Sequence, residues 1–279
     1  MAKKQYRSID EITHNGKTLR DIVDAHLVWI GSRGKRGNRA DLSMADLSTA
    51  DLHRVNLRGA DLVGANLIMA DLSEAELSAA DLMRTLLNGT NLSQAKLDGA
   101  NLFRAKLITA DLSMADLSGA ELRWTDLSWA NLSAAVLNGA NLLRAGLHGA
   151  NFNMAVFRFT VVSACDLSNV LALETVQHDG PSSIGIDTLF YSHGKIPEAF
   201  LQGAGVPNIF IRYVKSLIEN PIQVYSCFIS NASKDVGFVQ DLLGQLRDRG
   251  VRCWYYREDA KWGGRFRKIL AAPSTTTTS

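Results

Sequence analysis

The 279-residue sequence is poor in the residues and motifs that mark most enzyme sites. It has three cysteines and six histidines, and neither set shows the spacing of metal ligands. It has no glycine-rich phosphate loop and no nucleophile-elbow motif. Its many Asp and Asn residues recur at fixed intervals, as part of a repeated pattern. We therefore expect a non-catalytic chain with no catalytic residue, no bound metal and no cofactor.

Long apolar runs and early prolines are also missing. Without a run of 18 apolar residues or a signal peptide, nothing predicts a membrane partner. An odd number of cysteines in apolar contexts is typical of a reducing compartment, so we expect a cytoplasmic protein. All five prolines lie after residue 180. This change in composition indicates a boundary near residue 170.

Strong net charge is absent too, although the charges are unequally distributed. Residues 1–39 carry a net charge of +5, residues 40–169 carry −5, and the remainder carries +2. None of these segments is charged enough to indicate nucleic-acid binding by charge alone.

Residues 40–169 are 26 copies of one five-residue unit. The third position is Leu in 23 copies, and the first is Ala in 20. Residues five positions apart form no continuous stripe on an α-helix, and on a β-strand they point to opposite faces. The period of five predicts instead a chain that turns a corner in each repeat, with the Leu and the small residue directed inward and the other positions facing water.

This pattern resembles the pentapeptide-repeat family. The resemblance implies a mainly β fold, a right-handed quadrilateral β-helix over residues 40–169. An open first coil needs a cover, and the apolar residues of segment 19–30 follow helical spacing. We therefore predict an N-terminal helical cap over residues 1–39.

When coils of 20 residues stack, side chains 20 positions apart form columns on the outside of the β-helix. The sequence predicts that these columns differ in residue type. Aromatic and Arg side chains, which are enriched in binding hot spots, gather in two neighbouring columns and at one position on the next face. The alternative is an ordinary exposed column of long side chains. The predicted protein-interaction residues are Met83, Arg84, Phe103, Arg104, Arg123, Trp124, Trp129, Leu143 and Arg144.

The last repeats lose their polar exterior, because Val136, Val156 and Val161 occupy the Asp/Asn position. Either the following segment folds back on them, or this end of the β-helix forms a homodimer. Residues 170–222 are predicted to be a short helical connector, with helices at 196–202 and 207–218.

From Val224 the pattern changes to α/β. Strands are predicted at 224–230 and 251–256, parallel to each other, with an amphipathic helix between them. The inward residues of that helix are predicted to be Phe238, Val239, Leu242, Leu243 and Leu246. The phrases CFISNASKD, RDRGVRCWYY and REDAKWGGRF resemble the first strand, second strand and BB loop of a TIR domain. We expect a truncated TIR-like segment over 223–270 and a disordered tail over 271–279.

The order of these segments resembles bacterial pentapeptide-repeat/TIR proteins. Some TIR domains cleave NAD with a glutamate on a later helix, and the resemblance implies that this helix is absent here. We expect an interaction scaffold coupled to a TIR signalling or assembly module, with protein partners that include TIR-containing proteins. One alternative is an NAD-cleaving defence effector whose TIR domain is completed elsewhere. Another is a DNA mimic that binds gyrase, which the net charge of −5 over the repeat disfavours.

Overall fold

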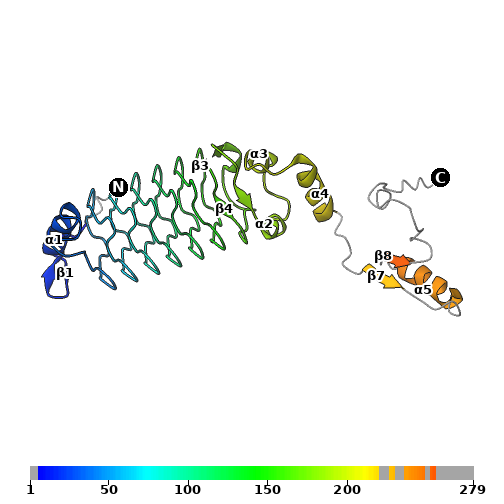
Figure 1. Ribbon diagram of the computed structural model, residues 1–279, viewed down its shortest axis with the longest axis horizontal. Coiled ribbons are helices and arrows are strands. Elements are labelled where there is room, and N and C mark those ends of the chain that lie inside the picture. The colour runs from blue at the N-terminus through cyan, green and yellow to red at the C-terminus, as the bar shows by residue number, and fades with distance from the viewer. Residues whose placement is uncertain (1–5, 220–225, 230–235, 249–251, 256–279) are drawn as a thin grey trace. The chain divides into compact units, whose positions relative to one another are not determined.

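The computed structural model describes residues 6–219, 226–229, 236–248 and 252–255. The chain divides into two compact units, Met1–Ile218 and Glu219–Ser279. The first unit begins with a short antiparallel hairpin, β1 (Thr13–His14) and β2 (Lys17–Thr18), followed by α1 (Leu19–Gly31). A long regular coil follows α1 and makes up most of this unit (Figure 1).

Parallel bridges join residues 20 positions apart throughout the coil. They form four ladders, which begin at Asp41, Asp46, Asp51 and Asn56. Between successive coils, the Leu42 N–H donates to the Asp61 carbonyl at 2.7 Å, and the Asp61 N–H donates to the Ala40 carbonyl at 2.9 Å. This pattern recurs from coil to coil, so the backbone groups of one coil are satisfied by the next. The β-helix predicted from the five-residue unit is confirmed.

The first and third positions of the repeat fill the interior. The leucines at the third position, from Leu42 to Leu147, are at most 2% exposed, and the alanines two residues before them are at most 4% exposed. Phe152 and Phe157 take the Leu position near the C-terminal end, where their rings meet edge to face at 5.6 Å. Burial of each Leu contributes about 1.5–3 kcal/mol, which makes this axial core the main source of stability.

Buried polar groups at the first position are satisfied by backbone carbonyls. The hydroxyls of Thr85, Thr90, Thr125 and Thr160 each donate to the carbonyl of a Leu 23 residues earlier, at 2.7–3.0 Å. The Cys165 thiol donates to the Leu142 carbonyl at 3.0 Å. Burial raises the pKa of Cys165 to about 11, so this thiol is a structural group rather than a nucleophile.

The second residue after the Leu position has a positive φ in every repeat from Met44 to Ala164. This left-handed conformation costs a side chain with a Cβ about 1–2 kcal/mol, and it explains why glycine is frequent there. Two tryptophans, Trp124 and Trp129, occupy this position, and Trp129 lies over Gly149, one coil further on. A Cβ at Gly149 would collide with the indole ring, whereas a Cβ at Gly139 would approach only Gly119, at 3.9 Å.

Helix α1 packs against the start of the coil. Its N-cap residue is Thr18, whose Oγ1 accepts from the Asp21 N–H at 3.2 Å. Leu19 and Val23 are buried in the same hydrophobic cluster as the leucines of the coil. His26 is fully buried, and its Nδ1 accepts from the Ala40 N–H at 3.0 Å. These contacts join α1 to the first repeat.

The segment after the repeats continues the coil. β3 (Val156–Phe157) pairs in parallel with β5 (Gln177–His178), and β4 (Val161–Val162) with β6 (Ser183–Ile184). A 3-10 turn, η1 (Leu173–Thr175), precedes β5. The apolar last repeats are therefore paired with the same chain. A homodimer through this end stays a prediction.

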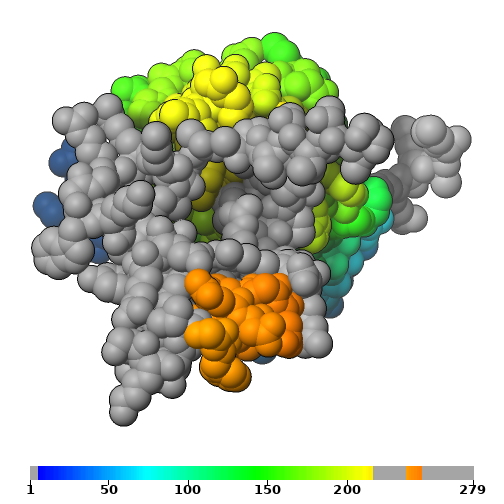
Figure 2. Space-filling view, turned by 90° about the vertical axis from the view of Figure 1, so that its right-hand side faces the viewer, coloured from blue at the N-terminus to red at the C-terminus, as the bar shows by residue number. Residues whose placement is uncertain are grey.

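Three helices complete the first unit: α2 (Ile186–Tyr191), α3 (Glu198–Gly203) and α4 (Asn208–Glu219). Leu189, Phe200 and Ile211 join the hydrophobic cluster of the coil. Viewed from this end, yellow atoms of the last helices lie in front of the green coils (Figure 2). The helices predicted at 196–202 and 207–218 begin one or two residues later, since Pro197 is an N-cap outside α3. Helix α2 was not predicted.

The second unit contains β7 (Ser226–Ile229), α5 (Val236–Asp248) and β8 (Arg252–Tyr255) in its described part. The two strands are parallel, as predicted, with Ser226 opposite Arg252. Val239 and Leu243 are buried, but Phe238 is 72% exposed, so its predicted inward position is wrong. Phe238 lies about 100° around the helix from Val239, outside the buried line. The predicted BB loop and the predicted tail lie outside the described residues.

His178 lies between the end of the coil and α3. Its ring centroid is 6.1 Å from that of Phe157 and 5.1 Å from that of Phe200. Both ring nitrogens are buried, and neither has a hydrogen-bond partner in the described part of the chain. Burial therefore lowers the pKa of His178, because the charged imidazolium would be poorly solvated there.

This site predicts a pH-dependent stability. The pKa of His178 in the folded state lies below its unfolded value of about 6.5. Neutral His178 therefore makes its full contribution to the free energy of unfolding above that pH. The contribution is lost as the pH falls through 6.5 toward the folded pKa. We expect the urea midpoint to drop between pH 7.5 and pH 5.5, and to drop less in His178→Phe. Burial also lowers the pKa of His26, so part of the drop should remain.

The exposed-histidine variant His53→Gln is the control, and a drop as large in His178→Phe as in the wild type would contradict this account.

The turn geometry gives a second prediction. Gly149→Ala and Gly139→Ala both place a Cβ at positive φ, which costs about 1–2 kcal/mol in each case. Only Gly149→Ala also displaces the Trp129 indole. We expect Gly149→Ala to lower the free energy of unfolding more than Gly139→Ala, and to shift the tryptophan emission. Equal losses in urea titrations of the two variants would show that Trp129 does not lie over Gly149.

Candidate protein-interaction site

The coil brings eight of the nine predicted residues together along one edge. They occupy the first and second positions after the Leu in one repeat of each of four successive coils. We call this set of residues the ridge. The ridge consists of Met83, Arg84, Phe103, Arg104, Arg123, Trp124, Leu143 and Arg144. The Arg84 N–H donates to the Phe103 carbonyl at 2.9 Å, and the Trp124 N–H donates to the Leu143 carbonyl at 3.1 Å. The backbone therefore fixes the spacing of the side chains along the ridge.

The two columns of the ridge differ in exposure. Met83, Phe103, Arg123 and Leu143 are half-buried, whereas Arg84, Arg104, Trp124 and Arg144 are exposed. All four residues of the exposed column have φ between 58° and 60°. Trp124 is 46% exposed although it is a large apolar side chain. Side chains of this kind at the surface mark interaction sites when they gather in one place.

Guanidinium groups stack on both aromatic rings of the ridge. The Arg144 Cζ lies 4.6 Å from the Trp124 ring centroid, and the Arg104 Cζ lies 5.9 Å from the same ring. Phe103 is contacted by Arg104 at 5.2 Å and by Arg123 at 5.5 Å. Each exposed cation–π contact is worth about 0.5–1 kcal/mol. The stacking orders the long side chains before any partner is present.

Within the described residues, one of the four ridge arginines is in an ion pair. The Arg123 Nε lies 2.7 Å from the Glu121 Oε1. Arg84, Arg104 and Arg144 make no ion pair within the described residues. The neighbouring Asp81 is already engaged, since its Oδ1 accepts from the Asn101 side-chain amide at 2.9 Å. The ridge is thus a basic, aromatic edge on an otherwise acidic repeat.

Trp129, the ninth predicted residue, lies on the neighbouring edge. It is 58% exposed and meets His148 edge to face, with ring centroids 5.0 Å apart. It shows no ring contact with the ridge in the described structure. Trp129 therefore lies on the next face, where the stacking of coils predicts it, and a role in partner binding stays a prediction.

Two grooves near α1 were not predicted from the sequence. One of about 450 Å³ is lined by Trp29, Arg33, Arg58 and Gly59 among others. The second, of about 270 Å³, has a mixed-charge lining that includes Lys17, Asp21, Arg39 and Asp41. Both are open and lie outside the ridge.

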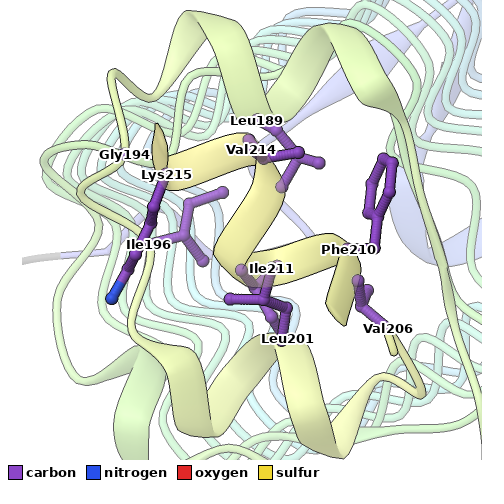
Figure 3. A pocket seen from close by; sticks show the side chains of 9 residues that line it. All are labelled: Leu189, Gly194, Ile196, Leu201, Val206, Phe210, Ile211, Val214 and Lys215. Atoms are coloured by element: carbon purple, nitrogen blue, oxygen red, sulfur yellow. The ribbon is translucent and has the colours of Figure 1, made fainter. Parts of the chain in front are cut away.

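A third pocket lies among helices α2, α3 and α4 and the segments that connect them. Its lining is apolar and includes Leu189, Ile196 and Phe210, with the Lys215 amine turned outward (Figure 3). Its volume of about 20 Å³ holds one water molecule at most. Among the described residues, no three His, Cys, Asp or Glu side chains are placed to hold a metal ion. No described helix is long and apolar enough to cross a membrane.

The sequence model described as "Pentapeptide repeats (8 copies)" matches residues 50–89, 86–123 and 125–169. No curated protein shows a significant match to the chain. Solved structures of repeat proteins do show similarity. HetL, a pentapeptide repeat protein involved in heterocyst differentiation regulation in Nostoc sp. strain PCC 7120, shares 30% identity over 53% of this chain and 72% of its own, with a TM-score of 0.25.

A pentapeptide repeat protein of the Arabidopsis thaliana thylakoid lumen shares 35% identity over 37% of this chain and 67% of its own, with a TM-score of 0.27. QnrB1, a plasmid-mediated fluoroquinolone resistance protein, shares 22% identity over 52% of this chain and 76% of its own, with a TM-score of 0.40. The family match covers the same residues as the ladders of bridges 20 positions apart. The chain therefore belongs to the pentapeptide-repeat family.

Proposed function

We propose that this chain is a non-catalytic scaffold that binds a protein partner through the ridge. The observation that carries the proposal is the cluster of stacked Arg and aromatic side chains on one edge of the coil. Arg and Trp are over-represented among residues that dominate binding energy. Because stacking already orders these side chains, association would lose less rotamer entropy than it would with free arginines.

The flanking segments have supporting roles in the proposal. Helix α1 would cap the first coil, which otherwise exposes Leu side chains and unpaired backbone groups. The C-terminal unit would act as a TIR-like signalling or assembly module in the cytoplasm. Its parallel β7–β8 pair and intervening α5 support that resemblance. TIR-containing proteins are therefore among the partners we propose.

Two alternatives, an NAD-cleaving enzyme and a DNA mimic, have less support. A DNA mimic needs closely spaced negative charge over an extended surface, whereas the ridge places arginines on one edge that form no ion pair with the described residues. The NAD-cleaving alternative rests on the TIR resemblance, and the loop expected to border that pocket lies outside the described residues.

Substitution of the ridge should abolish binding without unfolding the coil. We expect Arg104→Ala and Trp124→Ala each to lower the capture of a protein partner from lysate by about tenfold or more. Arg54→Ala and Met114→Ala are matched controls, since both residues are exposed at the same turn position on another edge, with φ of 58°. Far-UV circular dichroism should be the same for all four variants. Capture that survives both ridge substitutions would remove this surface from consideration.

A further inference from the structure

We propose that the ridge binds an acidic, extended peptide segment, with an apolar residue on Trp124 and carboxylates on Arg104 and Arg144. This inference rests on the proposed function and specifies the chemistry of the partner. It follows from three properties of the ridge: the orientation of its guanidinium groups, their spacing, and the charges on either side.

The stacked arginines keep hydrogen-bonding capacity for a partner. In a cation–π contact the guanidinium face lies toward the ring, so its N–H groups are directed along the edges of the plane. The Arg144 Cζ lies over the Trp124 ring at 4.6 Å from its centroid, and the Arg104 Cζ lies over the Phe103 ring at 5.2 Å. Since neither is in an ion pair within the described residues, their N–H groups can donate to a carboxylate in bidentate geometry.

The spacing of the arginines suits an extended peptide. Arg104 and Arg144 are 40 residues apart in sequence and therefore two coils apart along the ladder. At about 4.8 Å per coil this separation is about 10 Å. Residues i, i+2 and i+4 of an extended chain share one face and cover about 13 Å, which the long Arg and acidic side chains can match. The half-exposed ring of Trp124 lies between the two arginines. A segment with acidic residues two positions before and two positions after an apolar residue would present all three side chains to the ridge.

The charges beside the ridge favour a short acidic peptide over a nucleic acid. The bridged column next to the ridge contains Asp81 and Glu121, and Asp126 follows on the next face. These carboxylates accept hydrogen bonds within the repeat, at 2.9 Å from Asn101 to Asp81 and 2.7 Å from Arg123 to Glu121. Beyond the ridge the same column continues with Asp61 and Asp41, so a long polyanion would meet further carboxylates that a short peptide would not.

The test uses the full chain and fluorescein-labelled peptides. The probe is Gly-Glu-Ser-Leu-Ser-Glu-Gly, and the charge-reversed peptide with Lys for Glu and a single-stranded 12-nucleotide DNA are the comparisons. Fluorescence anisotropy gives Kd for the wild type and for Arg104→Gln, Arg144→Gln and Arg104→Lys. The matched control is Arg54→Gln, because Arg54 has the same φ of 58° and lies on another edge, paired with Glu74. Circular dichroism checks that each variant is folded.

We expect the acidic peptide to bind, and to bind at least tenfold more weakly to each Arg→Gln variant of the ridge. Binding to Arg104→Lys should be intermediate, because Lys keeps the charge but lacks the planar fork. Binding to Arg54→Gln should equal that to the wild type, and added salt should weaken the complex. Equal or tighter binding of the Lys peptide or of the DNA would overturn the inference. So would an unchanged Kd in both Gln variants.

This result can be separated from failure of the proposed function. Suppose that Arg104→Ala and Trp124→Ala abolish capture of a protein partner, but the acidic peptide does not bind. The ridge would then remain an interaction surface, and only the acidic chemistry of the partner would be wrong.

Discussion

The hydrogen bond between a Leu N–H and the carbonyl of the residue 19 positions later is the interaction on which the rest of this structure depends. It recurs from Leu42 onward, at 2.7 Å in the first pair, and it locks each coil to the next. Because both partners are backbone groups, the bond makes no demand on the outward side chains. The inward Leu and Ala residues exclude water from the axis and stabilise the same arrangement. Fold and surface are therefore encoded by different positions of the same repeat.

That separation explains how an interaction surface can vary without loss of the fold. The ladder places residues 20 positions apart in one column, so Phe103, Arg104, Arg123 and Trp124 become neighbours in consecutive coils. Their rings and guanidinium groups order one another at the surface. At the C-terminal end the same backbone pairing continues in β5 and β6, although the five-residue unit is lost there. Pairing of the backbone, rather than identity of the side chains, propagates the coil.

The sequence predicted the features that follow from periodicity. The interior Leu and Ala positions, the coil and the neighbours along the ridge all depend on counting by five and by twenty. Features that depend on actual geometry could not be predicted. The cation–π contacts of Arg144 and Arg104 with Trp124 depend on rotamers, and the packing of Trp129 over Gly149 depends on a positive φ that the repeat conceals. The groove at Trp29 and Arg58 combines two distant segments. Phe238 was misplaced because a helical pattern without its packing partners leaves the edge of the buried face undefined.

The most direct test of the account compares a triple ridge variant, Arg104→Asn, Trp124→Asn and Arg144→Asn, with the core variant Leu102→Ala. Asn tolerates the left-handed conformation of these three positions, so the triple variant should unfold near the wild-type urea midpoint but bind no partner. Leu102 is fully buried, so Leu102→Ala should lose about 2–5 kcal/mol of stability while its folded fraction still binds. A triple variant that loses as much stability as Leu102→Ala, or that retains binding, would contradict the separation of fold and function on which the account rests.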